Sequence, residues 1–298
     1  MLLLVSCVFA SLLDDANSLY SKGKAVEAIS LYKKAISAGE NPTLCYFNLA
    51  NAYYLLDSIA QAIVYYKAGL DDAPRFFRCR LNLAIAYYAI DELGECIAQM
   101  TEALALEPDN QKALMTLAFA YRKLCAYPQA VTYFERLAQL APEREEAPLN
   151  LGLLYRDLDD PREAVQWFDA YPASGKNAAT VLSYCADMSE AMGDTVKARY
   201  YCVKAFQKDT TKQWTYYRIV TLDEKTGNTL VAFEEAKQGV EKFPRFGDMA
   251  LLAGSMALRL ENYDEARRYY QVALANGCPG AATGLENVKA AAASRALP

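Results

Sequence analysis

A small residue recurs at a fixed step of 34 positions along most of this chain. It stands at eight positions, seven of which hold alanine: Ala28, Ala62, Cys96, Ala130, Ala164, Ala198, Ala232 and Ala266. From Ala62 and Ala266, an aromatic residue follows after four positions and a small residue after three more. A constant period of this length is typical of stacked supersecondary units that cannot bury their apolar faces alone. The sequence therefore predicts a repeat protein whose core extends along the stack.

The composition favours helices and argues against several classes of function. The 298 residues include only 14 glycines and 11 prolines, which favours an all-α chain. The net charge of -5 provides no general basic surface for nucleic acid. The sequence holds no histidine, the commonest general base and metal ligand. We therefore expect no enzymatic activity, no metal and no cofactor.

Eight cysteines are spread along the chain without a CxxC pair or the spacing of a zinc site. Several stand where the repeat requires a small apolar side chain, as Cys96 does in the alanine series. A free cysteine behaves as a small apolar residue, and a chain with this much core has little need of disulfides. We expect buried, unreactive thiols.

The sequence of each unit predicts two helices joined by a short turn. In the unit that begins at Thr43, apolar residues recur at helical spacing on both sides of Asp57-Ser58. Pro74 closes this unit, and proline returns at positions 108, 142 and 244, where it ends a helix. Turn-forming residues recur between the two helices of a unit, at Gly23, Asp57, Asp91, Asp159, Gly193 and Gly227.

This arrangement resembles the tetratricopeptide repeat family. Its unit has a Leu-Gly or Leu-Ala pair, then a tyrosine, an alanine, an aromatic residue, a small residue and a proline. The second unit matches that pattern through Leu49, Ala50, Tyr53, Ala62, Tyr66, Gly69 and Pro74. The resemblance spans residues 13–278 in eight units. It implies an all-α, right-handed superhelical solenoid of eight helix hairpins, with a C-terminal capping helix within 279–298.

The later units depart from the pattern. Asp223 stands where the tyrosine belongs, and turn formers at 171–177 interrupt the second helix of the fifth unit. The 34-residue register continues past this point. We expect a shortened helix that allows a bend in the stack, and no domain boundary.

Residues 1–12 form an apolar leader. The stretch resembles the end of a secretory signal, with Val8 and Ala10 at the small-residue cleavage positions. Leu4-Val5-Ser6-Cys7 also resembles a lipobox, which would make Cys7 a lipid-modified N-terminus. Either form of export would place the protein in the periplasm or anchor it to a membrane by a lipid. The alternative is that these residues begin the first helix of a cytoplasmic protein.

The first half also resembles the tetratricopeptide component of bacterial aerotolerance operons, the Bat type. Residues 16–36 and 46–70 carry this likeness. It implies an exported protein that acts in stress tolerance at the bacterial cell envelope.

In tetratricopeptide proteins the first helix of each unit lines a concave surface. At the corresponding positions this chain has asparagine, which both donates and accepts hydrogen bonds, tyrosine with its large ring and polar tip, and arginine, which suits carboxylates. We predict a peptide-binding groove formed by Asn17, Tyr20, Asn48, Asn51, Tyr54, Arg78, Asn82, Tyr88, Lys112, Arg122, Asn150 and Arg156. The alternative is that the asparagines join helices to one another and the tyrosines pack between units.

The chain lacks one element of the family's clamp for acidic C-terminal tails. The clamp requires a lysine where this sequence has Leu13, Phe47, Leu81 or Met115, so we do not expect it to bind such tails. In the later units Trp214 and Tyr217 predict a second, more apolar contact surface.

The sequence thus predicts a non-enzymatic scaffold that binds a peptide or partner protein and no nucleic acid. Two alternatives remain for the role: an accessory subunit that docks and regulates a catalytic partner, or a cytoplasmic co-chaperone-like adaptor. Self-association into a homo-oligomer is a third open possibility.

Overall fold

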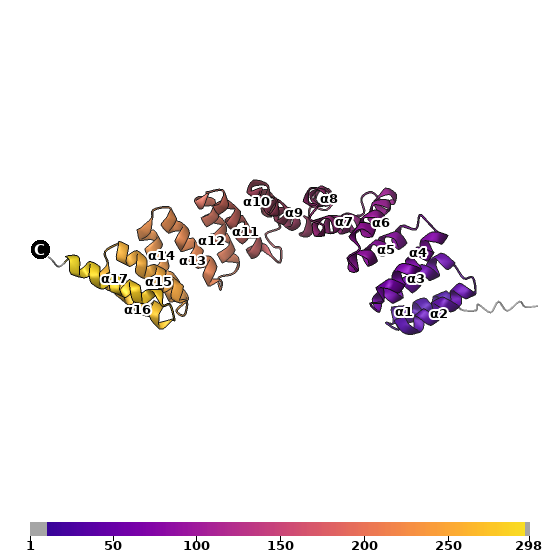
Figure 1. Ribbon diagram of the computed structural model, residues 1–298, viewed down its shortest axis with the longest axis horizontal. Coiled ribbons are helices and arrows are strands. Elements are labelled where there is room, and N and C mark those ends of the chain that lie inside the picture. The colour runs from indigo at the N-terminus through magenta and orange to yellow at the C-terminus, as the bar shows by residue number, and fades with distance from the viewer. Residues whose placement is uncertain (1–10, 296–298) are drawn as a thin grey trace, which may run out of the picture. The chain divides into compact units, whose positions relative to one another are not determined.

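The structure is a computed structural model that describes residues 11–295. This part of the chain folds into 17 α-helices (Figure 1). Their bounds are α1 Leu12–Ser21, α2 Ala25–Ser37, α3 Pro42–Leu55, α4 Ile59–Asp72, α5 Phe77–Ala89, α6 Leu93–Leu106, α7 Gln111–Lys123, α8 Tyr127–Leu140, α9 Glu146–Asp157, α10 Pro161–Asp169, α11 Ala178–Ala191, α12 Thr195–Lys208, α13 Gln213–Lys225, α14 Thr229–Lys242, α15 Gly247–Arg259, α16 Tyr263–Ala275 and α17 Gly280–Arg295. The predicted all-α class is confirmed.

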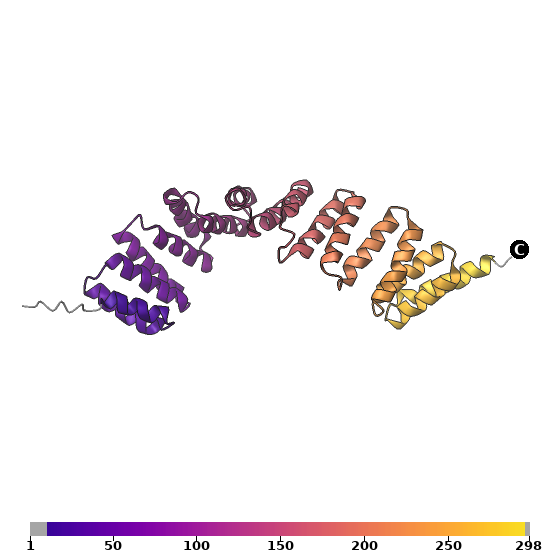
Figure 2. The same ribbon diagram turned by 180° about the vertical axis from the view of Figure 1, so that it is seen from behind.

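The chain divides into two compact units. The first, unit 1, ends at Ala147, and the second, unit 2, begins at Pro148, within the first turn of α9. In unit 1, α1 to α8 pack as successive neighbours, with the closest packing inside the pairs α3–α4 and α7–α8. In unit 2, α10 to α17 also pack in chain order. Figure 2 shows the same succession of helices from behind.

The alanine series lies where the two helices of a hairpin meet. All eight positions, from Ala28 to Ala266, are fully buried. A nearly absent side chain lets two helices approach closely, and the aromatic residue beside it fills the remaining space. At Gly152 of α9 the approach is so close that a Cβ atom would lie 2.4 Å from the Phe168 ring. Each aromatic side chain buried in this way contributes roughly 1.5–3 kcal/mol of transfer free energy.

A left-handed turn follows the first helix of every hairpin. Eight residues at steps of 34 have φ between 55° and 85°: Gly23, Asp57, Asp91, Cys125, Asp159, Gly193, Gly227 and Glu261. In the second hairpin the Ser58 amide donates to the Tyr53 carbonyl (2.9 Å) and the Asp57 amide to the Tyr54 carbonyl (3.0 Å). This is the Schellman arrangement, which uses carbonyls that the helix end leaves without a partner. The sequence indicated six of these turns; Cys125 and Glu261 are not turn formers, and only the register marks them.

Four of the second helices end where the prolines predict. The helices α4, α6, α8 and α14 each stop two residues before a proline, at Asp72, Leu106, Leu140 and Lys242. In contrast, α10 has only nine residues, because the turn formers from 171 onward take the chain out of the helix. The shortened helix is therefore confirmed, whereas the bend stays a prediction.

The ends of the described chain are held in different ways. Ser11 caps α1, since its hydroxyl accepts the Leu13 amide at 3.2 Å. At the other end, α17 packs against α15 and α16 and buries Ala281 and Val288 in the last core cluster. The signal-like and lipobox predictions, including Cys7, lie outside the described residues. Within residues 11–295, no helix combines the length and the apolar character needed to cross a membrane.

Most described cysteines are buried, as expected. Burial raises the pKa of the Cys79 and Cys185 thiols to about 12, so both stay protonated and unreactive near neutral pH. The expectation is wrong for Cys125, which is exposed in its turn, and Cys278 is half-buried. Cys125 departs from the rule because its repeat position lies in a turn between helices and not on a packed face.

Candidate functional site

Four of the predicted asparagines form a repeated hydrogen-bond network in unit 1. The Asn17 side-chain oxygen accepts the Tyr32 hydroxyl at 2.8 Å and the Asn48 amide nitrogen at 2.9 Å. One repeat later, the Asn51 oxygen accepts the Tyr66 hydroxyl at 2.5 Å and the Asn82 amide nitrogen at 2.9 Å. Each pair of bonds joins the two helices of one hairpin to the first helix of the next. We call these residues the asparagine ladder.

The asparagine ladder ends where the residue types change. At the next repeat the positions of Asn51, Tyr66 and Asn82 hold Ile85, Met100 and Thr116. The Thr116 hydroxyl donates to the Lys112 carbonyl of its own helix at 2.8 Å. The ladder is therefore restricted to the first three hairpins.

The tyrosines fix the asparagine side chains in one orientation. Burial raises the pKa of the Tyr32 hydroxyl to about 12 and the pKa of Tyr66 further still, so both hydroxyls keep the proton that they donate. Within the described part of the chain, no hydrogen bond uses the side-chain nitrogens of Asn17 and Asn51 or the side-chain oxygens of Asn48 and Asn82. The ladder thus joins helices, as the alternative interpretation expected, and still leaves donors and acceptors for another molecule.

A cavity of about 220 Å³ lies beside the ladder; we call it the ladder cavity. Five predicted residues line it: Tyr20, Asn51, Tyr54, Asn82 and Lys112. The sequence analysis missed three more, namely Leu55, Tyr66 and Ile85. Ile85 occupies the same repeat position as Asn51, so counting in the register was sufficient to find it. Tyr66 belongs to the second helix of its hairpin, and only the structure places it here.

The other predicted groove residues of unit 1 are not among those lining this cavity. The Arg78 guanidinium lies over the Phe47 ring, 5.4 Å from its centre, and the Lys123 ammonium lies 5.5 Å from the centre of the Tyr88 ring. Arg122 is half-buried.

Two predicted groove residues belong to unit 2. Asn150 is buried, and Arg156 donates to Asp157 at 2.8 Å while lying over the Tyr184 ring. That they extend one groove with the ladder cavity stays a prediction.

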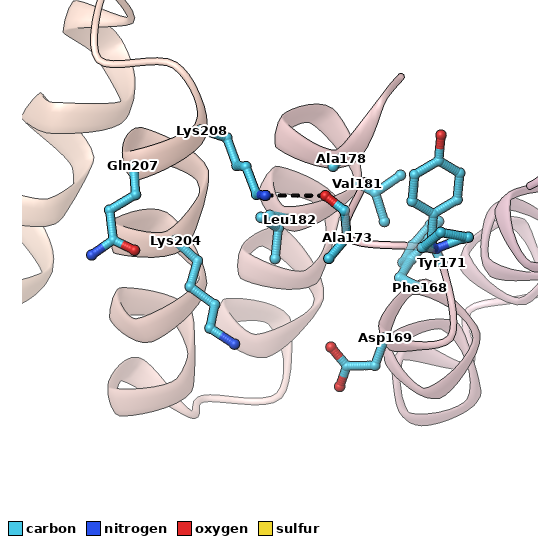
Figure 3. Close-up of a pocket in the computed structure, with 11 residues that line it drawn as sticks. Phe168, Asp169, Tyr171, Ala173, Ala178, Val181, Leu182, Lys204, Gln207 and Lys208 are labelled. Carbon is cyan, nitrogen blue, oxygen red and sulfur yellow. Dashed lines mark hydrogen bonds between the residues drawn. The ribbon is translucent and has the colours of Figure 1, made fainter. Parts of the chain in front are cut away.

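Unit 2 contains a larger cavity, of about 390 Å³, that the sequence analysis did not propose as a site. It lies among the end of α10, the start of α11 and the end of α12 (Figure 3). We call it the α10 cavity. Its apolar walls include Phe168, Val181 and Leu182, and Lys204 and Lys208 reach it from α12. The sequence signal was the run of turn formers at 171–177, which we interpreted only as a shortened helix.

Family models confirm what the hairpins indicate. Models described as tetratricopeptide repeat match residues 44–74, 116–179 and 217–282, together more than half of the chain. The chain belongs to the tetratricopeptide repeat family. A search of curated proteins finds no match, and the resemblance to the Bat-type component stays a prediction.

Solved structures support the same fold at low sequence identity. A tetratricopeptide repeat protein from Parabacteroides merdae ATCC 43184 is 17% identical, with a TM-score of 0.52 over 83% of this chain and 99% of that one. The structure of Naa15/Naa10 bound to HypK-THB gives a TM-score of 0.62 at 16% identity, over 83% of this chain and 38% of that one. Pseudomonas aeruginosa pilF is 17% identical, with a TM-score of 0.52 over 72% of this chain and 96% of that one.

The divergent tetratricopeptide units hold a partly buried ionic cluster. The Arg199 guanidinium of α12 donates to Asp223 of α13 at 2.5 Å and to Glu235 of α14 at 2.8 Å. Asp223, which replaces the family's tyrosine, is only 5% exposed. Burial, with the neighbouring Asp223 carboxyl adding to it, raises the pKa of Glu235 to about 7. One guanidinium pairs with two carboxyl groups. Because two carboxylates close together repel each other, the cluster favours a proton on one of them.

The predicted second surface is partly aromatic and partly ionic. Trp214, 59% exposed, packs edge-on against Phe246, with ring centres 4.7 Å apart, and against Tyr217 at 5.6 Å. Tyr217 also lines a cavity of about 330 Å³ beside α17. Glu190 forms ion pairs with Arg218 and Lys225. The pairing reduces the apolar character that the sequence analysis expected of this part of the repeat array.

Proposed function

We propose that this tetratricopeptide protein binds an extended segment of a partner protein in the ladder cavity. The family and fold suggest a protein–protein interaction scaffold; the site within it is our proposal. The observation that carries it is the asparagine ladder, whose side chains are already oriented and retain hydrogen-bonding capacity, and of which Asn51 and Asn82 line the cavity.

Preorganisation is the physical reason for this choice. A side chain that is immobilised only on binding costs about 0.5–1.5 kcal/mol in lost freedom. The bonds from Tyr32 and Tyr66 hold Asn17 and Asn51 in place before any partner arrives. Their amide nitrogens are suited to peptide carbonyls, and the oxygens of Asn48 and Asn82 to peptide N–H groups. The ladder therefore matches a peptide backbone, which alternates donors and acceptors.

The rest of the cavity wall indicates which side chains the segment carries. Tyr20, Tyr54, Leu55 and Ile85 supply apolar area with polar tips on the tyrosines. Lys112 adds one positive charge at the edge of the same cavity. We expect a segment with apolar residues and an acidic group near one end.

A scaffold is favoured over an enzyme. The sequence contains no histidine, and the residues that line the ladder cavity are amides, tyrosines, aliphatic residues and one lysine. No general base is paired with a nucleophile among them. We propose a non-enzymatic role, with the docking and regulation of a catalytic partner as the alternative. A catalytic protein captured with the chain, and altered in activity by it, would favour that alternative.

The test compares a ladder variant with a matched control. Asn48→Ala with Asn82→Ala removes two amides of the ladder, of which Asn82 lines the cavity, and Asn17 and Asn51 still keep their bonds from Tyr32 and Tyr66. Thr116→Ala changes the same repeat position where the hydroxyl serves only its own helix. Tagged full-length chains are used to capture partners from extracts of the source cells, and bound proteins are quantified by mass spectrometry.

We expect the double variant to retain at most about a tenth of a specific partner, since each lost hydrogen bond costs about 0.5–1.5 kcal/mol. The Thr116→Ala chain should retain all of it. Equal capture by all three folded chains would refute the ladder as the binding site.

We further propose that the protein works at the bacterial cell envelope, in assembly or stress tolerance. The support is the apolar, uncharged leader with its lipobox-like Leu4-Val5-Ser6-Cys7. Mass spectrometry of the native protein tests this directly. A lipid on Cys7, or an N-terminus at Ser11, would support export, and an intact Met1 would favour the cytoplasm.

A further inference from the structure

The α10 cavity exists because one hairpin lacks its last helical turn. The corresponding helices α4, α6, α8, α12 and α14 have 14 residues each, whereas α10 has nine. The space beside the following hairpin that a longer helix would occupy is open in this one place.

Other hairpins show what belongs in that space. At steps of 34 through the position of Pro172, the equivalent residues are Ile36, Leu70, Leu104, Ala138, Phe206, Val240 and Leu274. Five of them, from Ile36 to Val240, are partly buried and pack against a core cluster, whereas Ala138 is small and Leu274 is exposed. Pro172 follows the end of α10, is half-buried and lines the cavity itself. Five of the seven other hairpins thus place an apolar side chain of valine to phenylalanine size here, in the space that is open beside α10.

The walls are suited to such a side chain. Phe168 and Val181 are buried on the hydrophobic core beneath, and Leu182 is half-buried beside them. Figure 3 shows Leu182 between the loop at Ala173 and the lysines of α12. The volume of about 390 Å³ falls in the range of cavities that hold ligands, roughly 300–1,000 Å³.

The rim of the cavity adds positive charge. The helix α12 carries four basic residues and no acidic one, in a chain whose net charge is -5. Lys204 and Lys208 lie one turn apart on it and both line the cavity. The Lys204 ammonium lies 4.3 Å from the centre of the Tyr200 ring and forms no ion pair within residues 11–295. Lys208 uses one proton to reach the Ala173 carbonyl at 3.0 Å, which leaves two.

One acidic residue also lines the cavity. Asp169 accepts the Tyr201 hydroxyl at 2.6 Å, so its carboxylate is already engaged on the wall of α10. The two lysines therefore give the cavity a net positive charge. Their remaining ammonium protons can donate hydrogen bonds to a carboxylate.

We propose that the α10 cavity binds a short acidic segment of a partner protein, which inserts one leucine- or phenylalanine-sized side chain against Leu182 and Phe168 and places a carboxylate on Lys204 and Lys208. This site lies in unit 2 and shares no residue with the ladder cavity, so it stands or falls independently of the proposed function. The segment replaces the helical turn that α10 lacks.

A synthetic probe tests this without knowledge of the natural partner. The probe is a short fluorescent peptide that alternates glutamate with leucine and phenylalanine, titrated with the full-length chain by fluorescence anisotropy. One control peptide has glutamine for every glutamate, and another has alanine for every leucine and phenylalanine. The protein variants are Lys204→Gln with Lys208→Gln, and Ala178→Leu, which adds side-chain volume to the cavity wall. Lys242→Gln is the matched control, because Lys242 occupies the position of Lys208 one hairpin later.

We expect the acidic peptide to bind the unchanged chain and the Lys242→Gln chain equally. The double lysine variant should bind it at least about tenfold more weakly, since hydrogen bonds to charged groups are the stronger class. The Ala178→Leu chain should also lose affinity, and both control peptides should bind poorly. Binding that is unchanged in both cavity variants, no binding to the unchanged chain, or equal binding of the glutamine peptide would each overturn the proposal.

Discussion

Cys125 holds a backbone conformation that L-residues avoid. Its φ is 55°, at the repeat position where three other hairpins have glycine. A non-glycine residue in this region costs roughly 1–2 kcal/mol, part of which is offset because glycine loses more freedom on folding. We expect Cys125→Gly to raise the free energy of unfolding by about 0.5–1 kcal/mol, measured by urea denaturation.

Two glycines provide controls of opposite sign. A Cβ atom on Gly227 or on Gly94 would meet no atom within 4 Å, so packing does not enter. Gly227 has φ of 85° in the same kind of turn, and Gly227→Ala should lower stability by about 1 kcal/mol. Gly94 lies within α6, and Gly94→Ala should raise the free energy of unfolding by up to about 1 kcal/mol. Equal effects at both glycines would contradict the backbone explanation.

At the residue scale, the repeat register predicts whether a residue lies in a packed face or in a turn. It does not predict which side chains form hydrogen bonds with one another. It was sufficient to find the buried alanines and most of the turns. It could not show that Asn17 accepts from Tyr32 and Asn48 together, since those bonds depend on side-chain orientation across three helices. The exposed Cys125 was missed because its type favours a core position, while its place in the register puts it in a turn.

At the scale of helices, the cluster of Arg199, Asp223 and Glu235 joins α12, α13 and α14. The pKa of Glu235 rises from 4.5 when unperturbed to about 7 in the fold. Between these pH values the folded protein holds a proton that the unfolded chain has released. The stabilisation is therefore complete below about pH 4.5 and is lost as the pH rises toward 7.

This linkage predicts how one substitution changes the pH dependence of stability. In Glu235→Gln a neutral amide replaces the protonated carboxyl, so the decrease that Glu235 causes between about pH 4.5 and 7 should disappear. The difference between the two proteins should grow to a few kcal/mol at most by pH 8, because one pKa unit corresponds to about 1.4 kcal/mol. Urea denaturation at a series of pH values measures it. Glu234→Gln, at an exposed neighbour paired with Lys237, is the control and should leave the slope unchanged.

The ends of the helices could be predicted from the sequence, whereas the space between helices could not. Proline and the spacing of apolar residues were enough for the ends of α4, α6, α8 and α14. The early end of α10 was also predicted, from the turn formers at 171–177. The cavity that results was not, because it depends on what neighbouring helices present to the open space, in this case Leu182 and Lys204.

At the scale of the whole molecule, stability is distributed over several cores. Unit 1 contains one cluster around Ala28 and Tyr32 and another around Tyr66 and Leu83. Unit 2 has its own clusters, one around Phe168 and one around Met256. In a repeat array each hairpin contacts mainly its neighbours, so the stability approximates a sum of hairpin terms and nearest-neighbour terms. The effect of a core substitution should therefore decline with distance along the array.

Hydrogen exchange followed by mass spectrometry can measure that decline. Leu83 of α5 is 2% exposed, and Leu83→Ala should cost about 2–5 kcal/mol locally. Amides of α3 to α8 should then exchange faster, while those of α13 to α17 keep their protection, since local openings follow local stability. Met256 of α15 is also fully buried. Met256→Ala should give the opposite pattern, with faster exchange in α13 to α17 and unchanged exchange in α1 to α4. If either substitution accelerated exchange equally in every helix, the chain would unfold as one cooperative block and the nearest-neighbour description would be wrong. A gradient on both sides would mean that a partner bound in the ladder cavity stabilises chiefly the hairpins it contacts.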